Sequence, residues 1–217
     1  MTILQRKWKQ SILTIFGNIK LTIHGDSSLH HAVTMNLIDV TKLLIVNGAN
    51  INAKDTLGNT PLHLAVLNQN LRLSLILLKK GAKVNIQNLA LQTPLHIVID
   101  IRHMEIIQFL LPYPKNINSK DFQSNTMLHL ACNHNMENIA IKLIQLGADP
   151  NLTNFQRNTP FHMAMTHDVS RLTRFFLQNT NVTRKQNMIG NNILEEGLFH
   201  NKLINVKIYI NVIHLID

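Results

Sequence analysis

Short apolar runs alternate with polar turn segments along most of the chain, and the alternation has a fixed period of 33 residues. The segment Thr60-Pro61-Leu62-His63 has counterparts in the same phase at 27–30, 93–96, 126–129, 159–162 and 192–195. Glycine-alanine pairs that close a unit share this spacing and begin at Gly48, Gly81 and Gly147. Self-similarity at such a period indicates a repeat architecture, in which each unit is one small supersecondary element.

The pattern inside one unit predicts two helices. Thr60 stands directly before an apolar run and can cap a helix with its hydroxyl, and Pro61 suits the first helical position because no backbone donor is lost there. A second apolar run, Ile76-Leu77-Leu78, precedes the closing glycine. Because only a neighbouring unit can cover this second apolar face, we expect an all-α solenoid of helix-turn-helix units with short hairpin-like turns.

These in-phase segments resemble the ankyrin repeat family, over residues 25–217. The resemblance implies units that begin near residues 25, 58, 91, 124, 157 and 190, the last one being a divergent cap. It also implies a left-handed residue after each first helix, a place that the family usually gives to glycine and that is occupied here by Asn36, Gln69, Arg102, Asn135 and Asp168. Only asparagine and aspartate tolerate that conformation readily, so we expect strain of about 1 kcal/mol at the glutamine and the arginine.

Residues 1–24 stand outside the repeats. Leu4, Trp8 and Ile12 fall on one helical face, and basic residues lie away from it. This pattern predicts an amphipathic N-terminal helix that caps the first repeat, or a degenerate half repeat. A membrane-surface, targeting or signal-like segment is the alternative.

One histidine position recurs in five units, at His30, His63, His96, His129 and His162. A group that recurs at one structural position serves the unit, whereas a catalytic group is needed once. Equivalent side chains of stacked repeats also lie too far apart for a single metal ion, whose ligands stand at about 2 Å. The family resemblance implies that these histidines hydrogen-bond backbone and threonine groups around the hairpin.

Residues with catalytic potential do not form a recognisable constellation. We find no phosphate-binding glycine loop, nucleophile elbow or zinc-ligand spacing, and therefore expect a protein that is not an enzyme and holds no cofactor or metal. The single cysteine, Cys132, is expected to pack in a helix and suits a reducing compartment. Glu195 and Glu196 are adjacent carboxylates that point in different directions on a helix, so a solvated face is expected for them.

The formal net charge is +9, and the basic residues are scattered. No aromatic residues interleave them as a stacking platform for single strands would require, so direct nucleic-acid binding is not expected. We expect the positive charge to favour binding of an acidic or amphipathic protein segment, or of an acidic membrane surface. No apolar run approaches the roughly 18 residues of a membrane span, and we expect a cytoplasmic or nuclear protein, with delivery into a host cell left open.

The family resemblance implies that partners bind the concave groove formed by the hairpin tips and the exposed side of each first helix. Large apolar residues at the tips, Leu89, Phe122 and Phe155, are the expected anchors of this groove. The alternative is that they fold against their own hairpins. By repeat phase the candidate partner-binding residues are Leu57, Asn59, Leu67, Leu89, Gln92, Asp100, Ile101, Phe122, Asn125, Asn133, His134, Phe155, Asn158 and His167.

The expected function is protein–protein interaction without catalysis. Two kinds of role suit a short protein of this family: an inhibitor-like or host-directed binder, including a tailless relative of the Rel/NF-kappa-B inhibitors, and an adaptor that recruits targets to an enzyme complex such as a ubiquitin ligase. The chain ends in an apolar stretch, 208–216, which leaves self-association through that end as a further expectation.

Overall fold

The computed structural model describes residues 27–113, 116–167, 170–179 and 185–213, and the predicted N-terminal helix and Asp168 lie outside them. The chain divides into two compact units, Met1–Pro114 and Lys115–Asp217. In the described residues the secondary structure is helical, apart from an isolated bridge between Lys120 and Thr126, and the predicted all-α helix-turn-helix stack is confirmed. None of the helices described is long and apolar enough to cross a membrane.

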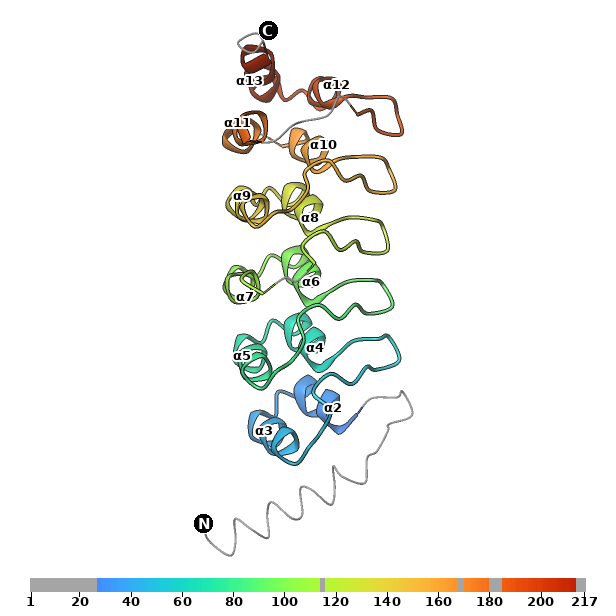
Figure 1. The fold of residues 1–217 in the computed structure, drawn as a ribbon, viewed down its shortest axis with the longest axis vertical. Coiled ribbons are helices and arrows are strands. Elements are labelled where there is room, and N and C mark those ends of the chain that lie inside the picture. The colour runs from blue at the N-terminus through green and yellow to red at the C-terminus, as the bar shows by residue number, and fades with distance from the viewer. Residues whose placement is uncertain (1–26, 114–115, 168–169, 180–184, 214–217) are drawn as a thin grey trace, which may run out of the picture. The chain divides into compact units, whose positions relative to one another are not determined.

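The first compact unit contains three helix pairs. First helices α2, α4 and α6 pack side by side in one layer, and the second helices form another layer on the side away from the hairpin turns, to the left in Figure 1. Long hairpin turns project from the side of the first helices. The bounds are α2 Ser28–Thr34, α3 Ile38–Val46, α4 Pro61–Leu67, α5 Leu71–Lys79, α6 Pro94–Asp100 and α7 Met104–Leu110.

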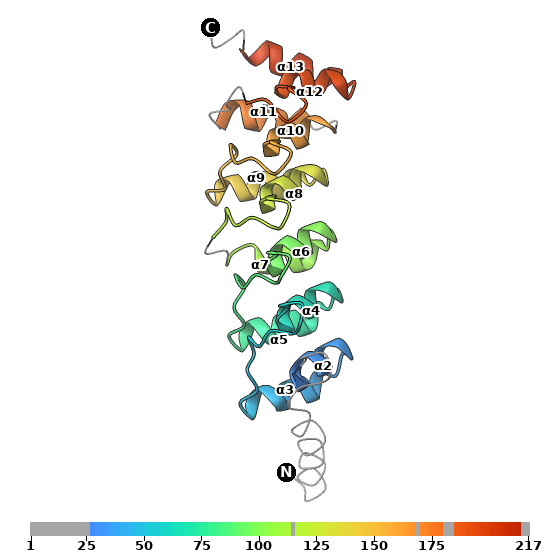
Figure 2. The ribbon, with the colours of Figure 1, turned by 90° about the vertical axis from the view of Figure 1, so that its right-hand side faces the viewer.

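The second compact unit repeats this arrangement. Helices α8, α10 and α12 form the layer of first helices, and α9, α11 and α13 form the layer of second helices, as two perpendicular views show (Figures 1 and 2). The bounds are α8 Met127–Asn133, α9 Glu137–Gln145, α10 Pro160–Met165, α11 Ser170–Asn179, α12 Ile193–Phe199 and α13 Leu203–Ile213. In both units each first helix therefore begins 33 residues after the preceding one.

The predicted caps start every first helix. Each cap residue has extended backbone, and it exchanges hydrogen bonds with the residue three positions later in a capping box. The cap residues are Ser27, Thr60, Thr93, Thr126, Thr159 and Asn192. In the last unit Glu195 takes the place of the histidine and accepts the Asn192 backbone N–H at 2.7 Å, so the divergent unit keeps the same device.

The core of each unit lies between the two helix layers. In the first unit Leu62, Leu73 and Leu77 are fully buried between the layers. In the second unit the rings of Phe161 on α10 and Phe176 on α11 stack at 4.7 Å between centroids. Each helix is too short to be stable alone, since isolated helices below about 12–15 residues are marginal in water, so this packing holds the fold together.

The predicted left-handed residues after the first helices are confirmed where the structure describes them. Asn36, Gln69, Arg102 and Asn135 have φ of 55°, 54°, 60° and 57°. An L-residue in this conformation brings its Cβ close to the following carbonyl oxygen, at a cost of roughly 1–2 kcal/mol. Asparagine tolerates it better because its short polar side chain can hydrogen-bond locally.

We therefore predict that Arg102→Gly will raise the free energy of unfolding by about 1 kcal/mol, because glycine has no Cβ to clash. The matched change Asn135→Gly, at the equivalent position of the next unit, should gain less than half of that. Chemical denaturation of the two variants and the native protein measures the difference. Equal gains at both positions would show that side-chain strain at Arg102 is not the cause.

Candidate partner-binding surface

The hairpin turns are shaped by one aspartate or asparagine per unit. Its side-chain oxygen accepts the backbone N–H of the residue four positions later, at 2.7–3.0 Å in every case. Such a side chain mimics a turn of the backbone and fixes the hairpin. These residues are Asp55, Asn88, Asp121, Asn154 and Asn187. Sequence reasoning missed them, although their 33-residue spacing is a visible signal.

The fourth residue of each turn is left-handed. Gly58 and Gly190 occupy this place in two hairpins, but Leu91, Ser124 and Arg157 occupy it in the others with φ of 57°, 61° and 59°. At Gly58 an added Cβ would stand only 2.9 Å from the Leu89 nitrogen, so glycine is also required there by the close approach of the next hairpin. The second and third residues of each turn consequently form an exposed tip with a fixed backbone.

In the first compact unit the hairpin tips expose leucine. Leu57 and Leu89 are both mostly exposed, and the Leu89 backbone N–H donates to the Leu57 carbonyl oxygen at 2.9 Å. This hydrogen bond ties one tip to the next. Both leucines belong to the predicted partner-binding residues, and both are available to a partner.

In the second compact unit the hairpin tips expose aromatic rings. Phe122 is 67% exposed and Phe155 is 64% exposed, and their ring centroids lie 6.4 Å apart in an edge-to-face arrangement. The backbone N–H of Phe155 donates to the Gln123 carbonyl oxygen at 3.1 Å, and Met188 N–H donates likewise to Gln156. Exposed Met188 and Ile189 continue the row of tips, which we call the tip strip: Phe122, Phe155, Met188 and Ile189.

Further exposed residues lie at the ends of the first helices in this unit. Asn133 is exposed, and its carbonyl oxygen lies 2.7 Å from Nε2 of His167, so the structure brings these two predicted residues together. His134 is half-buried beside them in sequence. Phe199, exposed and in edge contact with the His200 ring, holds the same repeat position as Asn133 and was missed by sequence reasoning. The repeat phase alone would have found it.

Two of the predicted asparagines are buried between hairpins. Asn59 is 4% exposed and Asn125 is 7% exposed, and the amide groups of Asn88 and Asn154 donate to their side-chain oxygens. Their side chains therefore join neighbouring hairpins and are not available to a partner, contrary to the expectation from phase. These side chains are buried because each asparagine lies at the base of its hairpin, directly before the helix cap, and not at the tip.

The remaining predicted residues vary in exposure. Leu67 and Asp100 are exposed at the ends of α4 and α6, while Ile101 is half-buried. Gln92 and Asn158 are also half-buried, and their backbone carbonyl oxygens face Nε2 of His63 and His129. Gln92 and Asn158 thus stabilise the hairpin mainly through their backbone carbonyl groups.

The recurring histidines are structural in the way the family resemblance implied. His129 Nδ1 lies 3.1 Å from the Thr126 backbone N–H and accepts it, so Nδ1 carries no proton. Nε2 lies 3.0 Å from the Asn158 carbonyl oxygen and donates to it. The same pattern holds for His63, through Thr60 and Gln92. The rings of His63 and His129 therefore each fasten a first helix to the hairpin of the following repeat.

Burial favours the neutral form of these rings. Desolvation lowers the pKa of His63 and of His129 from 6.5 to about 4, although the hydrogen bonds to backbone carbonyls oppose the shift. Burial lowers the pKa of His162 as well. A ring that is neutral, buried and engaged at both nitrogens is poorly placed for acid–base chemistry on a substrate.

Other chemically capable residues are also enclosed. Cys132 is fully buried on α8, and burial raises the pKa of its thiol, so packing is its role here. Glu195 is exposed, as expected, but the expectation of a solvated face is wrong for Glu196, which is buried. Its carboxylate accepts the amides of Asn187 and Asn191 at 3.0 Å each and closes the last hairpin. Within the described residues no cluster of three or more His, Cys, Asp or Glu could hold a metal ion.

A family model described as ankyrin repeats in three copies matches residues 10–88 and 87–154. The match begins inside the N-terminal segment and ends before α10, while α10 to α13 continue the same spacing. Comparison with curated proteins gives no match.

Proposed function

Because this chain belongs to the ankyrin repeat family, whose repeats are protein-interaction modules, we propose that it is a non-enzymatic module that binds a protein partner on its hairpin tips and the adjoining ends of its first helices. The exposed pair Phe122 and Phe155 carries the proposal. Large aromatic side chains are costly to leave in water and are favoured anchors of interfaces.

The hairpins do not need these rings for their own structure. The turn is held by Asp121 or Asn154 and by backbone hydrogen bonds, while the aromatic ring at the tip stays about two-thirds exposed. The alternative that the rings fold against their own hairpins would require them to be buried. The exposure of both therefore supports a binding role.

The chemistry of the tip strip suggests an amphipathic partner segment. Its members are phenylalanine, methionine and isoleucine, and the ends of the first helices and the residues that follow them add Asn133, His167 and Phe199. Such a surface favours aliphatic or aromatic side chains on the partner, with hydrogen-bonding groups at the rim. An acidic character of this partner is a weaker expectation, since the cations near the tip phenylalanines in sequence are Lys120 and Arg157, and Lys120 already donates to the Thr153 carbonyl oxygen at 2.8 Å.

The test is affinity capture with the native protein and with a variant that carries Phe122→Glu and Phe155→Glu. We expect captured partners to be lost from the variant, because a carboxylate cannot be buried in an apolar contact without a large desolvation cost. Mass spectrometry identifies the partner, and titration of that purified partner measures the loss, for which at least about a tenfold weaker affinity is expected. The first unit is probed separately by Leu57→Glu and Leu89→Glu.

The matched control carries Gln145→Glu and Leu146→Glu, two exposed residues near the end of α9 in the same unit. This control adds the same number of carboxylates away from the tips and should retain the partner. Circular dichroism verifies that both variants remain helical. A partner that survives the tip charges, or that is lost equally from the control, would refute the binding site.

A further inference from the structure

The second helices of the C-terminal unit present a separate charged surface. Helices α9, α11 and α13 pack in one layer, away from the hairpin tips (Figure 1). Their exposed side chains include four cations and, on α13, several large aliphatic groups, of which Ile204 stands among the cations by repeat phase. We call this surface the basic helix face, and its residues are Lys142, Arg171, Arg174, Ile204 and Lys207.

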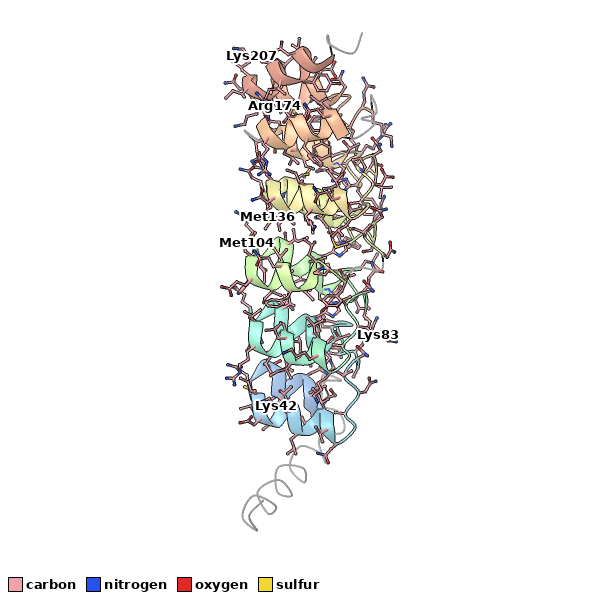
Figure 3. The ribbon with its side chains drawn as sticks, turned by 60° about the vertical axis from the view of Figure 1, so that its left-hand side comes forward. Lys42, Lys83, Met104, Met136, Arg174 and Lys207 are labelled. Atoms are coloured by element: carbon pink, nitrogen blue, oxygen red, sulfur yellow. The ribbon has the colours of Figure 1, made fainter. Side chains whose placement is uncertain are left out.

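Repeat phase shows how this face departs from the first unit. On α3, Asp39 and Lys42 stand three residues apart and form an ion pair at 3.5 Å. The same two positions hold Arg171 and Arg174 on α11, and Ile204 and Lys207 on α13. Figure 3, in which the layer of second helices comes forward, labels Arg174 and Lys207 on these neighbouring helices. The carboxylate of the pair has thus been replaced by an arginine and then by an isoleucine.

The cations of this face are uncompensated. Lys42 pairs with Asp39 and His200 with Glu196, and neither ion pair involves the basic helix face. Arg171 donates to the side-chain oxygen of Asn138, a neutral group. Glu137 of α9 is the one carboxylate on these three helices, and it is half-buried. The positive charges of the face are therefore in excess and repel each other, and an anionic surface would relieve that repulsion.

An apolar group stands among the charges. Ile204 is 57% exposed, at a position where the other second helices carry Asp39, Arg72, Glu105, Asn138 and Arg171. Leu203 beside it is also about half exposed. Exposed aliphatic groups next to lysine and arginine are typical of helices that lie in the boundary between headgroups and acyl chains of a membrane.

We propose that the basic helix face docks onto an anionic lipid surface. The cations come from three successive helices and so cover a broad face, which suits the two-dimensional array of charges on a bilayer. Ile204 and Leu203 favour lipid over nucleic acid, because an aliphatic side chain gains little against a phosphate backbone, and the face has no aromatic ring to stack on bases. The tip strip remains available for the protein partner, so the two surfaces act independently.

The test measures partition of the full chain onto vesicles by sedimentation. The vesicles contain phosphatidylcholine alone or phosphatidylcholine with about 30% phosphatidylserine, and salt is varied from about 0.1 to 1 M to screen the charges. We expect the native protein to bind the anionic vesicles and to be released by salt. A variant with Arg171→Glu, Arg174→Glu and Lys207→Glu should partition about 100-fold more weakly. Ile204→Ser should weaken binding by a smaller factor that persists at the higher salt.

The matched control reverses three exposed lysines of the first unit, Lys79→Glu, Lys80→Glu and Lys83→Glu, and so changes the net charge equally. It should retain most of the binding. Equal loss in the control would mean that net charge alone acts, which overturns the proposal. So would absence of binding to anionic vesicles, equal binding to neutral ones, or tighter binding of the same face to a DNA duplex or a polyglutamate peptide. Circular dichroism checks the fold of each variant.

Discussion

Replacement of Phe161 by alanine should lower the free energy of unfolding of the C-terminal unit by about 3–5 kcal/mol. Phe161 is fully buried on α10 and stacks on Phe176 of α11 at 4.7 Å, with the Tyr209 ring of α13 at 6.3 Å. The truncation leaves a cavity where three helices meet, and it removes the aromatic contact as well. Because each of these helices depends on the others for stability, the loss should spread through the last two repeats.

Phe155→Ala is the matched control for this change, because it deletes the same side chain from an exposed position of the same unit. Surface changes of this kind usually alter stability by no more than about 0.5 kcal/mol. Guanidinium or urea unfolding, followed by circular dichroism, measures both variants. Similar destabilisation by the two would show that the core is not organised around Phe161.

Acidification should destabilise both compact units through their neutral histidines. The pKa of His63 and of His129 is about 4 in the fold, against 6.5 for an unperturbed ring. Between these values the unfolded chain binds a proton that the folded ring does not, so the stabilising contribution is present above about pH 6.5 and is lost as the pH falls toward 4. Between pH 7.5 and pH 5, each ring should therefore lower the free energy of unfolding of its compact unit by about 2 kcal/mol.

His63→Gln and His129→Gln test this cause. Each variant will be less stable at neutral pH, since one helix-to-hairpin link is weakened, but its stability should depend less on pH, by about 2 kcal/mol over the same interval. Unfolding at about pH 7.5 and pH 5 gives the slope, and titration of the imidazole NMR signals gives the pKa directly. An unchanged slope in both variants would assign the acid sensitivity to other groups.

The period of the sequence predicts much of the fold because one local rule is repeated. A cap such as Thr126, an apolar run and a left-handed residue such as Asn135 are each visible in the sequence, and the structure places all three at the expected phase. Even Gln69 and Arg102 adopt the left-handed conformation against their own preference. Tertiary packing of the unit therefore outweighs the strain at a single residue.

The candidate surface was harder to predict. The position of a residue in the repeat does not show whether its side chain is covered by the neighbouring hairpin or projects into solvent. Asn59 and Leu57 are two residues apart, yet the first is buried between hairpins and the second projects into solvent. Glu196 is adjacent to exposed Glu195 but turns inward to the hairpin amides. The division of the chain near Pro114 was also not anticipated, although Pro112 and Pro114 stand where the other units continue the helix or carry glycine.

In each hairpin, the residues that fix the turn are different from the residues that are exposed at its tip, and this difference matters for the evolution of the chain. Asp121 and Asn154 fix the shape of their turns, whereas Phe122 and Phe155 only occupy the space that those turns present. Mutation at the second kind of position can change what is recognised without a cost in folding, so new specificities are reachable by single steps through viable intermediates. The same property makes positions 122, 155 and 188 natural sites for randomised libraries on this scaffold.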